Sequence, residues 1–395
     1  MLTFSVVVML VLAKSTKSLQ AMLNEIVPRL SGVRTTVSNT AYSKARAKLR
    51  HTAFIELNKM CVLPAVYEDG DYETYKGLRV LAVDGSKIMV PDNASTNAYF
   101  GSFDSTSPIV SNTYCMGLAS VLYDVVNGVC IDAVFANGHA AEADLAIDSL
   151  KLTDENDLVI YDRGYCSFRM LNAASDAKGH FLIRCHRRSF GVTRDMFEGK
   201  GPEDITVTLE PGYKHLRQGL DKPVRVRFLR VVLDTGEIEV LSTSLLDQDA
   251  HPAEDFKDLY WKRWGVETFY GILKGRLDIE NFTGLSSESV LQDFHASVFL
   301  TGMEAVFTKD ANDELQARDT VHNYKVNKAV SFNAIKSRAF ELILSDKPID
   351  AVIEELDALF LTNPVAIRPG RSPSRTDPGA LKRLNFWKRR RKAVY

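Results

Sequence analysis

Four polar residues recur with a spacing that would place them along one side of a helix. They are Tyr260, Arg263, Glu267 and Lys274. At about 100° per residue they fall within a stripe roughly 60° wide. The carboxylate could bind a cation, and the guanidinium and ammonium could hold a phosphate. The alternative is an ordinary ion pair between Arg263 and Glu267, with Tyr260 and Lys274 solvated.

Two aspartates upstream each follow a short apolar run. Asp84 follows residues 78–83 and precedes a Gly-Ser turn, while Asp162 follows residues 158–161 and precedes Arg-Gly. We expect both at the C-terminal ends of strands, close to Glu267. Three carboxylates that meet in this way repel one another unless cations lie between them, so the cluster is typical of a hard-cation site. For each aspartate taken alone, the alternative is a turn residue.

Carboxylate ligands favour Mg²⁺, with Mn²⁺ as a plausible substitute. Two such ions, held by Asp84, Asp162 and Glu267, could activate a water or a 3′-hydroxyl and stabilise the leaving oxygen of a phosphodiester. The chain has no Cys/His cluster, which argues against zinc. Its five cysteines show no paired spacing, which indicates a reducing compartment and hence a cytoplasmic protein.

The elements that must position these residues form a mixed α/β pattern. Strands are predicted at 78–84, 114–124, 128–135, 158–162, 179–184 and 237–244, with helices at 141–152 and around 170. This order predicts a mixed sheet flanked by helices. Glycine-rich residues 186–235 interrupt the order and contain extended segments at 204–209 and 224–229, so we expect a β-rich insertion there.

Both ends of the chain are basic although the formal net charge is only −1. Residues 1–50 carry eight Lys and Arg against one Glu, and residues 368–395 carry ten against one Asp. This asymmetry is expected of a protein that contacts a polyanion at its extremities, but solvated tails share it.

Residues 1–60 have helical periodicity, with one helix to about residue 30 and a second at 38–57. The apolar run Thr3–Ala13 is too short to cross a bilayer and is predicted to be a core-packing helix; a signal peptide is the alternative. The second helix suits a DNA-contacting role, or an ordinary basic helix. Its relevant residues are Tyr42, Lys44, Arg46, Lys48 and Arg50. Helices are also predicted from 285 to about 361, before a tail rich in Pro, Ser and Arg that we expect to be flexible.

The Tyr-(2)-Arg-(3)-Glu-(6)-Lys spacing at residues 260–274 resembles the signature of DDE transposases of the bacterial insertion-sequence-four type. Asp84-Gly-Ser and Asp162-Arg-Gly-Tyr-Cys-Ser resemble the first and second aspartate motifs of that family. The segments 323–327 and 368–371 resemble its C-terminal region, so the likeness covers nearly the whole chain.

The resemblance implies a ribonuclease-H-like core interrupted by a β-rich insertion. It implies that Asp84, Asp162 and Glu267 bind metal while Tyr260, Arg263 and Lys274 bind DNA. The regions expected are a helical N-terminal DNA-binding region at 1–75, a catalytic core at 76–185 and 236–284, the insertion at 186–235, and a helical C-terminal region with a basic tail at 285–395. In the best-studied relatives a tryptophan of the insertion receives a flipped base during hairpin formation. This insertion has no tryptophan, and Phe190, Tyr213 or Phe228 could stack instead.

The function expected is that of a metal-dependent DNA transposase. It would bind the terminal inverted repeats of its element and cut and join strands, working in the cytoplasm at the nucleoid as a homodimer on DNA, without a membrane partner. Two alternatives remain: a nuclease of the same fold that cuts without joining, and a DNA-binding regulator whose metal site is inactive.

Overall fold

The computed structural model describes residues 2–14, 18–31, 36–104, 113–344 and 347–367. The chain divides into two compact units. The first comprises Met1–Gly70, Ile88–Met116 and Ile272–Tyr395, and the second comprises Asp71–Lys87 and Gly117–Gly271. The basic tail from residue 368, for which flexibility is predicted, lies outside the described residues.

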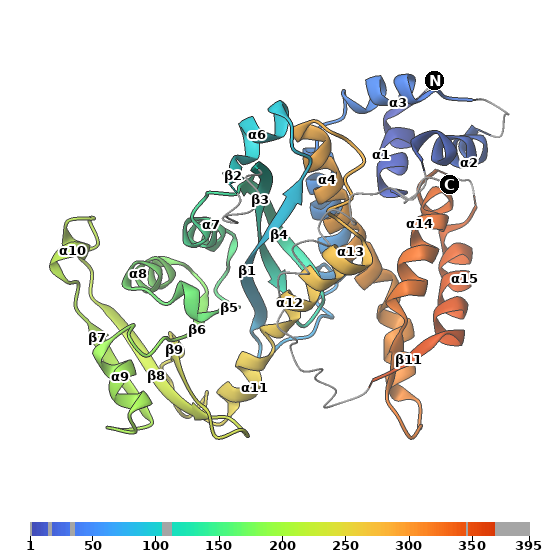
Figure 1. Ribbon diagram of the computed structural model, residues 1–395. Helices are drawn as coiled ribbons and strands as arrows, with labels where there is room; N and C mark the ends of the chain where they lie inside the picture. Colours follow the sequence, from blue (N-terminus) through green and yellow to red (C-terminus); the bar gives the residue numbers. More distant parts are fainter. Residues whose placement is uncertain (1, 15–17, 32–35, 105–112, 345–346, 368–395) are drawn as a thin grey trace. The chain divides into compact units, whose positions relative to one another are not determined.

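The second unit contains most of a mixed β-sheet, of which β2, the end of β1 and the start of β3 fall within the bounds of the first unit (Figure 1). Within the described residues the sheet has nine strands, in the order β2-β3-β1-β5-β6-β9-β8-β7, with β4 paired to β3. The strands are β1 (Arg79–Val90), β2 (Ser102–Asp104), β3 (Thr113–Asp124), β4 (Val129–Asn137), β5 (Asp157–Tyr161), β6 (His180–Arg184), β7 (Asp204–Leu209), β8 (Val224–Val232) and β9 (Ile238–Thr243). Strands β1, β5 and β6 are parallel neighbours, whereas β3 with β4 and the series β6-β9-β8-β7 are antiparallel.

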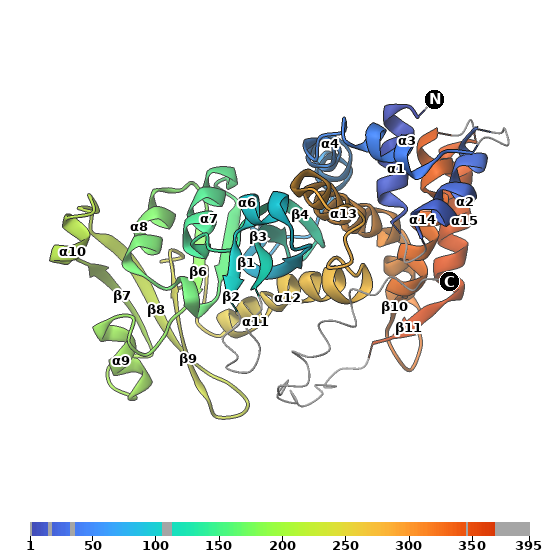
Figure 2. The same cartoon turned by 45° about the horizontal axis from the view of Figure 1, so that its top comes forward.

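Helices cover both faces of this sheet. The second unit contains α7 (Glu142–Ser149), α8 (Phe168–Asp176), α9 (Gly191–Phe197), α10 (Tyr213–Leu216), α11 (Asp255–Trp261) and α12 (Trp264–Gly271). In Figure 2, α7 and α8 lie on one side of the strands, and α11 and α12 lie on the other. This arrangement confirms the predicted α/β fold, a mixed sheet flanked by helices.

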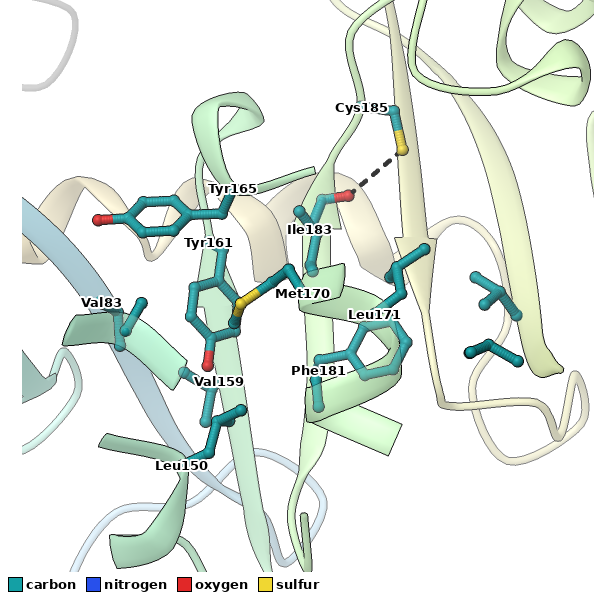
Figure 3. Packing of buried hydrophobic residues seen from close by; sticks show 14 of the residues in the cluster. Val83, Leu150, Val159, Tyr161, Tyr165, Met170, Leu171, Phe181, Ile183 and Cys185 are labelled. Carbon is teal, nitrogen blue, oxygen red and sulfur yellow. Dashed lines mark hydrogen bonds between the residues drawn. The ribbon is translucent and has the colours of Figure 1, made fainter. Parts of the chain in front are cut away.

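Strand β5 shows why the sheet is buried on both faces. All five of its residues are buried, as expected for a central strand between parallel neighbours. Val159 and Tyr161 pack in one core with Met170 and Leu171 of α8 (Figure 3). The alternate residues Leu158 and Ile160 pack in a second core with Phe256, Leu259 and Tyr260 of α11. The two-residue period of the strand therefore divides its side chains between two helical layers.

The predicted insertion, residues 186–235, contains α9, β7, α10 and β8. Strands β7 and β8 continue the sheet through β9. Of the aromatic residues suggested for stacking, Phe228 is fully buried and packs against Phe190, so it is not available to a base. Tyr213 is 78% exposed.

The first unit is mainly helical. Its helices are α1 (Phe4–Leu12), α2 (Leu19–Ser31), α3 (Asn39–Arg46), α4 (Thr52–Leu57), α5 (Leu63–Tyr67), α6 (Ala94–Phe100), α13 (Ser287–Ala317), α14 (Lys328–Leu344) and α15 (Ile349–Thr362). Val7–Leu12 are all buried and α1 packs against α13 and α14, which confirms the core-packing helix. Two short strands that the sequence did not predict, β10 (Tyr324–Val326) and β11 (Pro364–Ala366), pair antiparallel. Among the described residues, no helix is both long and apolar enough to cross a membrane.

Two predictions for the N-terminal region were wrong. The single helix expected to about residue 30 is two helices, α1 and α2, and the second expected helix is also divided, into α3 and α4. Arg46, expected among the DNA-contacting residues, is 4% exposed and binds Asp293 at 2.7 Å and Gln292 at 2.8 Å. Tyr42 is buried as well, whereas Lys44, Lys48 and Arg50 are exposed.

Candidate active site

Asp84 lies inside β1 and not at its end. The strand continues to Val90, so the prediction that Asp84 terminates a strand was wrong. The backbone N–H of Gly85 donates to Asp84 Oδ1 at 3.0 Å. Burial raises the pKa of Asp84 to about 6; the Gly85 N–H and Arg263 oppose this rise, while Glu142 and Glu267 add to it. The main cause is the loss of hydration of the carboxylate, and repulsion by the two glutamates is a smaller contribution.

Asp162 directly follows the end of β5, as predicted. The parallel register pairs Val83 with Tyr161, so Asp84 and Asp162 follow paired residues on neighbouring strands. The hydroxyl of Tyr260 is 3.4 Å from Asp162 Oδ1 and donates to it. Burial raises the pKa of Tyr260, so the phenol keeps its proton and remains a donor to the carboxylate.

The predicted Tyr260–Lys274 helix is interrupted. Helix α11 ends at Trp261, α12 begins at Trp264, and a π-helical turn, Ile272–Arg276, follows Gly271. The π turn changes the helical period, so an ideal-helix alignment does not extend to Lys274. Lys274 is half-buried and belongs to the first unit.

Arg263 is the cation of the cluster in the second unit. It is 5% exposed, and its Nη2 binds Glu267 Oε1 at 2.7 Å, so the ion pair of the alternative interpretation is present. Its charge also acts on Asp84 and Asp162. The buried Nε of Arg263 has no hydrogen-bond partner within the described chain. The guanidinium therefore offsets the charge of three carboxylates and still has one unused donor.

The three carboxylates do not form a closed ligand set in this arrangement. Among the described residues, no group of three or more His, Cys, Asp or Glu is placed to hold a metal ion. The donor chemistry nevertheless fits a hard divalent cation, because all three side chains offer carboxylate oxygens. Glu267 would have to exchange Arg263 for the metal.

Comparison with known proteins identifies the family. The transposase DDE domain matches residues 75–301, more than half of the chain. The chain belongs to the DDE transposase family. Such a domain depends in general on divalent metal ions, and carboxylate oxygens such as those of Asp84, Asp162 and Glu267 are donors that these ions prefer.

Two proteins of Escherichia coli K12 are similar in sequence to this chain. The transposase InsG of insertion sequence element IS4 is 28% identical over 215 residues, 52% of this chain and 46% of that protein. The putative transposase InsZ is 25% identical over 152 residues, 38% of this chain and 49% of that protein. Each match spans about half of the relative's length. The cryo-EM synaptic complex of the piggyBac transposase with hairpin DNA superposes with a TM-score of 0.45 at 7% identity, over 97% of this chain and 78% of that one, a level that does not establish a common fold.

Sequence reasoning missed three residues around the site of this DDE transposase. The hydroxyl of Tyr270 lies 3.0 Å from the carbonyl oxygens of both Asp84 and Ala119, so it ties α12 to β1 and β3. Its position three residues after Glu267 was a usable signal. Tyr165, within the second aspartate motif, donates to Glu142 at 2.5 Å. No spacing in the sequence pointed to Glu142.

Proposed function

We propose that this chain is a DNA transposase that binds the terminal inverted repeats of its own element, cleaves the strands there and joins the 3′ ends to target DNA. The observation that carries the proposal is the register of β1 against β5 within the matched DDE domain. It brings Asp84 beside Asp162, and Tyr270 holds the backbone of Asp84 against the helix that carries Glu267.

In this proposal Asp84, Asp162 and Glu267 bind two Mg²⁺ ions, for which Mn²⁺ can substitute. Bound metal would supply activation of the attacking oxygen and stabilisation of the leaving oxygen. The chain's own contribution is to hold the carboxylates on rigid elements. Tyr260 orients Asp162 through its hydroxyl, and Tyr270 fixes the strand of Asp84.

Tyr260, Arg263 and Lys274 are proposed to contact DNA phosphates. Two observations support this role for Arg263: its Nε has no hydrogen-bond partner within the described chain, and its Nη2 forms an ion pair with Glu267. If Glu267 bound the metal, the guanidinium of Arg263 would lose its carboxylate partner, and a DNA phosphate would be an acceptor of suitable charge and geometry. The residue would thus change partners between the free and the DNA-bound protein.

The regional assignment is part of the same proposal. Residues 1–75 would contact DNA through exposed basic residues such as Lys44, Lys48 and Arg50, residues 76–185 and 236–284 would form the catalytic core, and 186–235 the insertion. Residues 285–395 would form the C-terminal region. The protein would act as a homodimer on paired DNA ends, in the cytoplasm at the nucleoid.

A supercoiled donor plasmid that carries the DNA flanking this gene tests the proposal. With Mg²⁺, wild-type protein should cleave and join the ends, and Asp84→Ala, Asp162→Ala and Glu267→Ala should each abolish both reactions. Cleavage without joining would indicate a nuclease, and binding without cleavage a regulator. Wild-type joining by all three variants would show that the active site was assigned to the wrong residues.

A further inference from the structure

The carboxylate of Glu142 lies against the residue that follows Asp84. Glu142 is the first residue of α7. A Cβ atom placed on Gly85 would lie 2.6 Å from both Cδ and Oε1 of Glu142, far closer than real contacts allow. Gly85 is not among the described glycines with positive φ. A side chain at position 85 would therefore displace the Glu142 carboxylate, whereas the backbone conformation there does not call for glycine.

Tyr165 holds this carboxylate in place. Its hydroxyl donates to Glu142 Oε1 at 2.5 Å. The tyrosine is 4% exposed, and its ring packs on Tyr161 with the centroids 5.6 Å apart. Tyr165 is the last residue of a short 3-10 helix, Arg163–Tyr165, whose N-cap is Asp162. Within the described chain this is the only hydrogen bond to the Glu142 carboxylate.

One side chain therefore connects the backbone at both aspartates. The Glu142 side chain lies against Gly85, which follows Asp84. It also accepts a hydrogen bond from Tyr165, three residues after Asp162. Both contacts are within the second unit. The backbone N–H of Gly85 donates to Asp84 Oδ1, and Glu142 lies against the same glycine. A shift of Glu142 would therefore alter the orientation of the Asp84 carboxylate.

We propose that Glu142 and Tyr165 are a positioning pair that holds Asp84 and Asp162 in the geometry that binds the divalent metal. The inference rests on the proposed metal site of Asp84, Asp162 and Glu267. Groups that support metal ligands in this way typically contribute 10–100-fold to metal affinity or activity.

The test is Mn²⁺ binding to the full chain, followed by electron paramagnetic resonance, with circular dichroism to show that each variant is folded. Glu142→Ala and Tyr165→Phe should each weaken Mn²⁺ binding by about tenfold. Glu142→Gln keeps the shape and the acceptor oxygen, so it should remain within about threefold of wild type. Asp144→Ala is the matched control: it lies in the same turn of α7, is exposed, pairs with Arg169, and should leave binding unchanged.

A second arm uses the glycine. Gly85→Ala should displace Glu142 and weaken Mn²⁺ binding as Glu142→Ala does. In the Glu142→Ala background the space is empty, so adding Gly85→Ala should cause no further loss. Additive effects of the two substitutions would overturn the proposal. The proposal would also be overturned if Glu142→Gln bound Mn²⁺ as weakly as Glu142→Ala does. The charge of Glu142, and not its hydrogen bond and shape, would then be decisive.

The two proposals fail in different ways. If wild-type protein shows no Mn²⁺ binding that Asp84→Asn removes, the proposed metal site is wrong, and the positioning pair fails with it. If Asp84→Asn removes binding but Glu142→Ala and Tyr165→Phe bind Mn²⁺ like wild type, the metal site stands and the positioning pair alone is wrong.

Discussion

Arg263 occupies, among the carboxylates of the second unit, the electrostatic role that a metal would take. It pairs with Glu267 at 2.7 Å and is almost fully buried. Removing one partner of a buried ion pair leaves the other charge uncompensated, which is costly. The free protein and the metal-bound protein should therefore depend on Arg263 in opposite directions.

We expect Arg263→Gln to lower the thermal midpoint of the metal-free protein and to increase its affinity for Mn²⁺ several-fold, because Glu267 no longer has to leave a guanidinium. Added Mn²⁺ should reverse most of this decrease in the thermal midpoint. Arg169→Gln removes the same charge from an exposed pair with Asp144 and serves as the control. Unchanged or weaker Mn²⁺ binding by Arg263→Gln would contradict the exchange of partners.

Two buried tyrosines in the second unit give a matched comparison. The hydroxyl of Tyr270 reaches two carbonyl oxygens at 3.0 Å, whereas that of Tyr161 is buried without a hydrogen-bond partner in the described chain. Tyr270→Phe should cost about 1–3 kcal/mol of unfolding free energy, because buried acceptors lose their donor. Tyr161→Phe should be neutral or stabilising, since it removes an unsatisfied polar group. The thermal midpoint should fall for Tyr270→Phe and should stay or rise for Tyr161→Phe; equal decreases in the two variants would refute the assignment.

At the scale of elements, helix α13 carries a buried histidine from which we expect the first unit to lose stability in acid. His295 is 5% exposed and stacks on His51, whose ring pairs with Glu288 at 3.0 Å. Burial, with the nearby His51, lowers the pKa of His295 to about 3. An unfolded histidine takes up a proton below about pH 6.5. Between those values the unfolded state binds more protons, so stability falls as the pH falls from about 6.5 towards 3.

At pH 5 this difference amounts to roughly 2 kcal/mol. The thermal midpoint of wild type should therefore drop between pH 7.5 and pH 5, and His295→Gln should show a smaller drop. His322→Gln, at an exposed position of the same unit, should keep the wild-type drop. If His295→Gln kept it too, another group would be responsible for the acid sensitivity.

Much of the sheet was predictable because its strands are apolar runs bounded by turns. Strands β3 to β6 and β9 lie within a few residues of their predicted ranges. The continuation of β1 past Asp84 was not predictable, since residues 84–87 are polar and read as a turn. The burial of Arg46 was missed for a similar reason: its partners Gln292 and Asp293 are distant in sequence, and only packing brings them together.

The residues of the candidate site were proposed from local sequence motifs, and their roles stay predictions. Local motifs were enough to select Asp84, Asp162 and Glu267 as candidates, because each follows or lies within a strong strand or helix pattern. The ideal-helix alignment of four residues ignored the break after Trp261 and the π turn after Gly271. Glu142 is recognisable only from its contact with Gly85, which no sequence period encodes.

At the scale of the whole molecule, charge is distributed unevenly along a nearly neutral chain. Residues 368–395 alone carry ten Lys and Arg. If these residues contact DNA phosphates, affinity should fall steeply between 50 and 200 mM salt, and a chain that ends at residue 367 should show a shallower dependence. Fluorescence anisotropy with end DNA measures both slopes. Equal slopes would show that the tail does not contact phosphate.

The hydrogen bond from Tyr270 to the carbonyl of Asp84 spans 186 residues of chain. A ribosome that adds roughly 5–20 residues per second needs about 10–40 s to cover that distance. During this interval Asp84 has been made but the helix that carries Glu267 has not. The first aspartate therefore emerges well before its partners, and the proposed metal site can be completed only after Glu267 has been made.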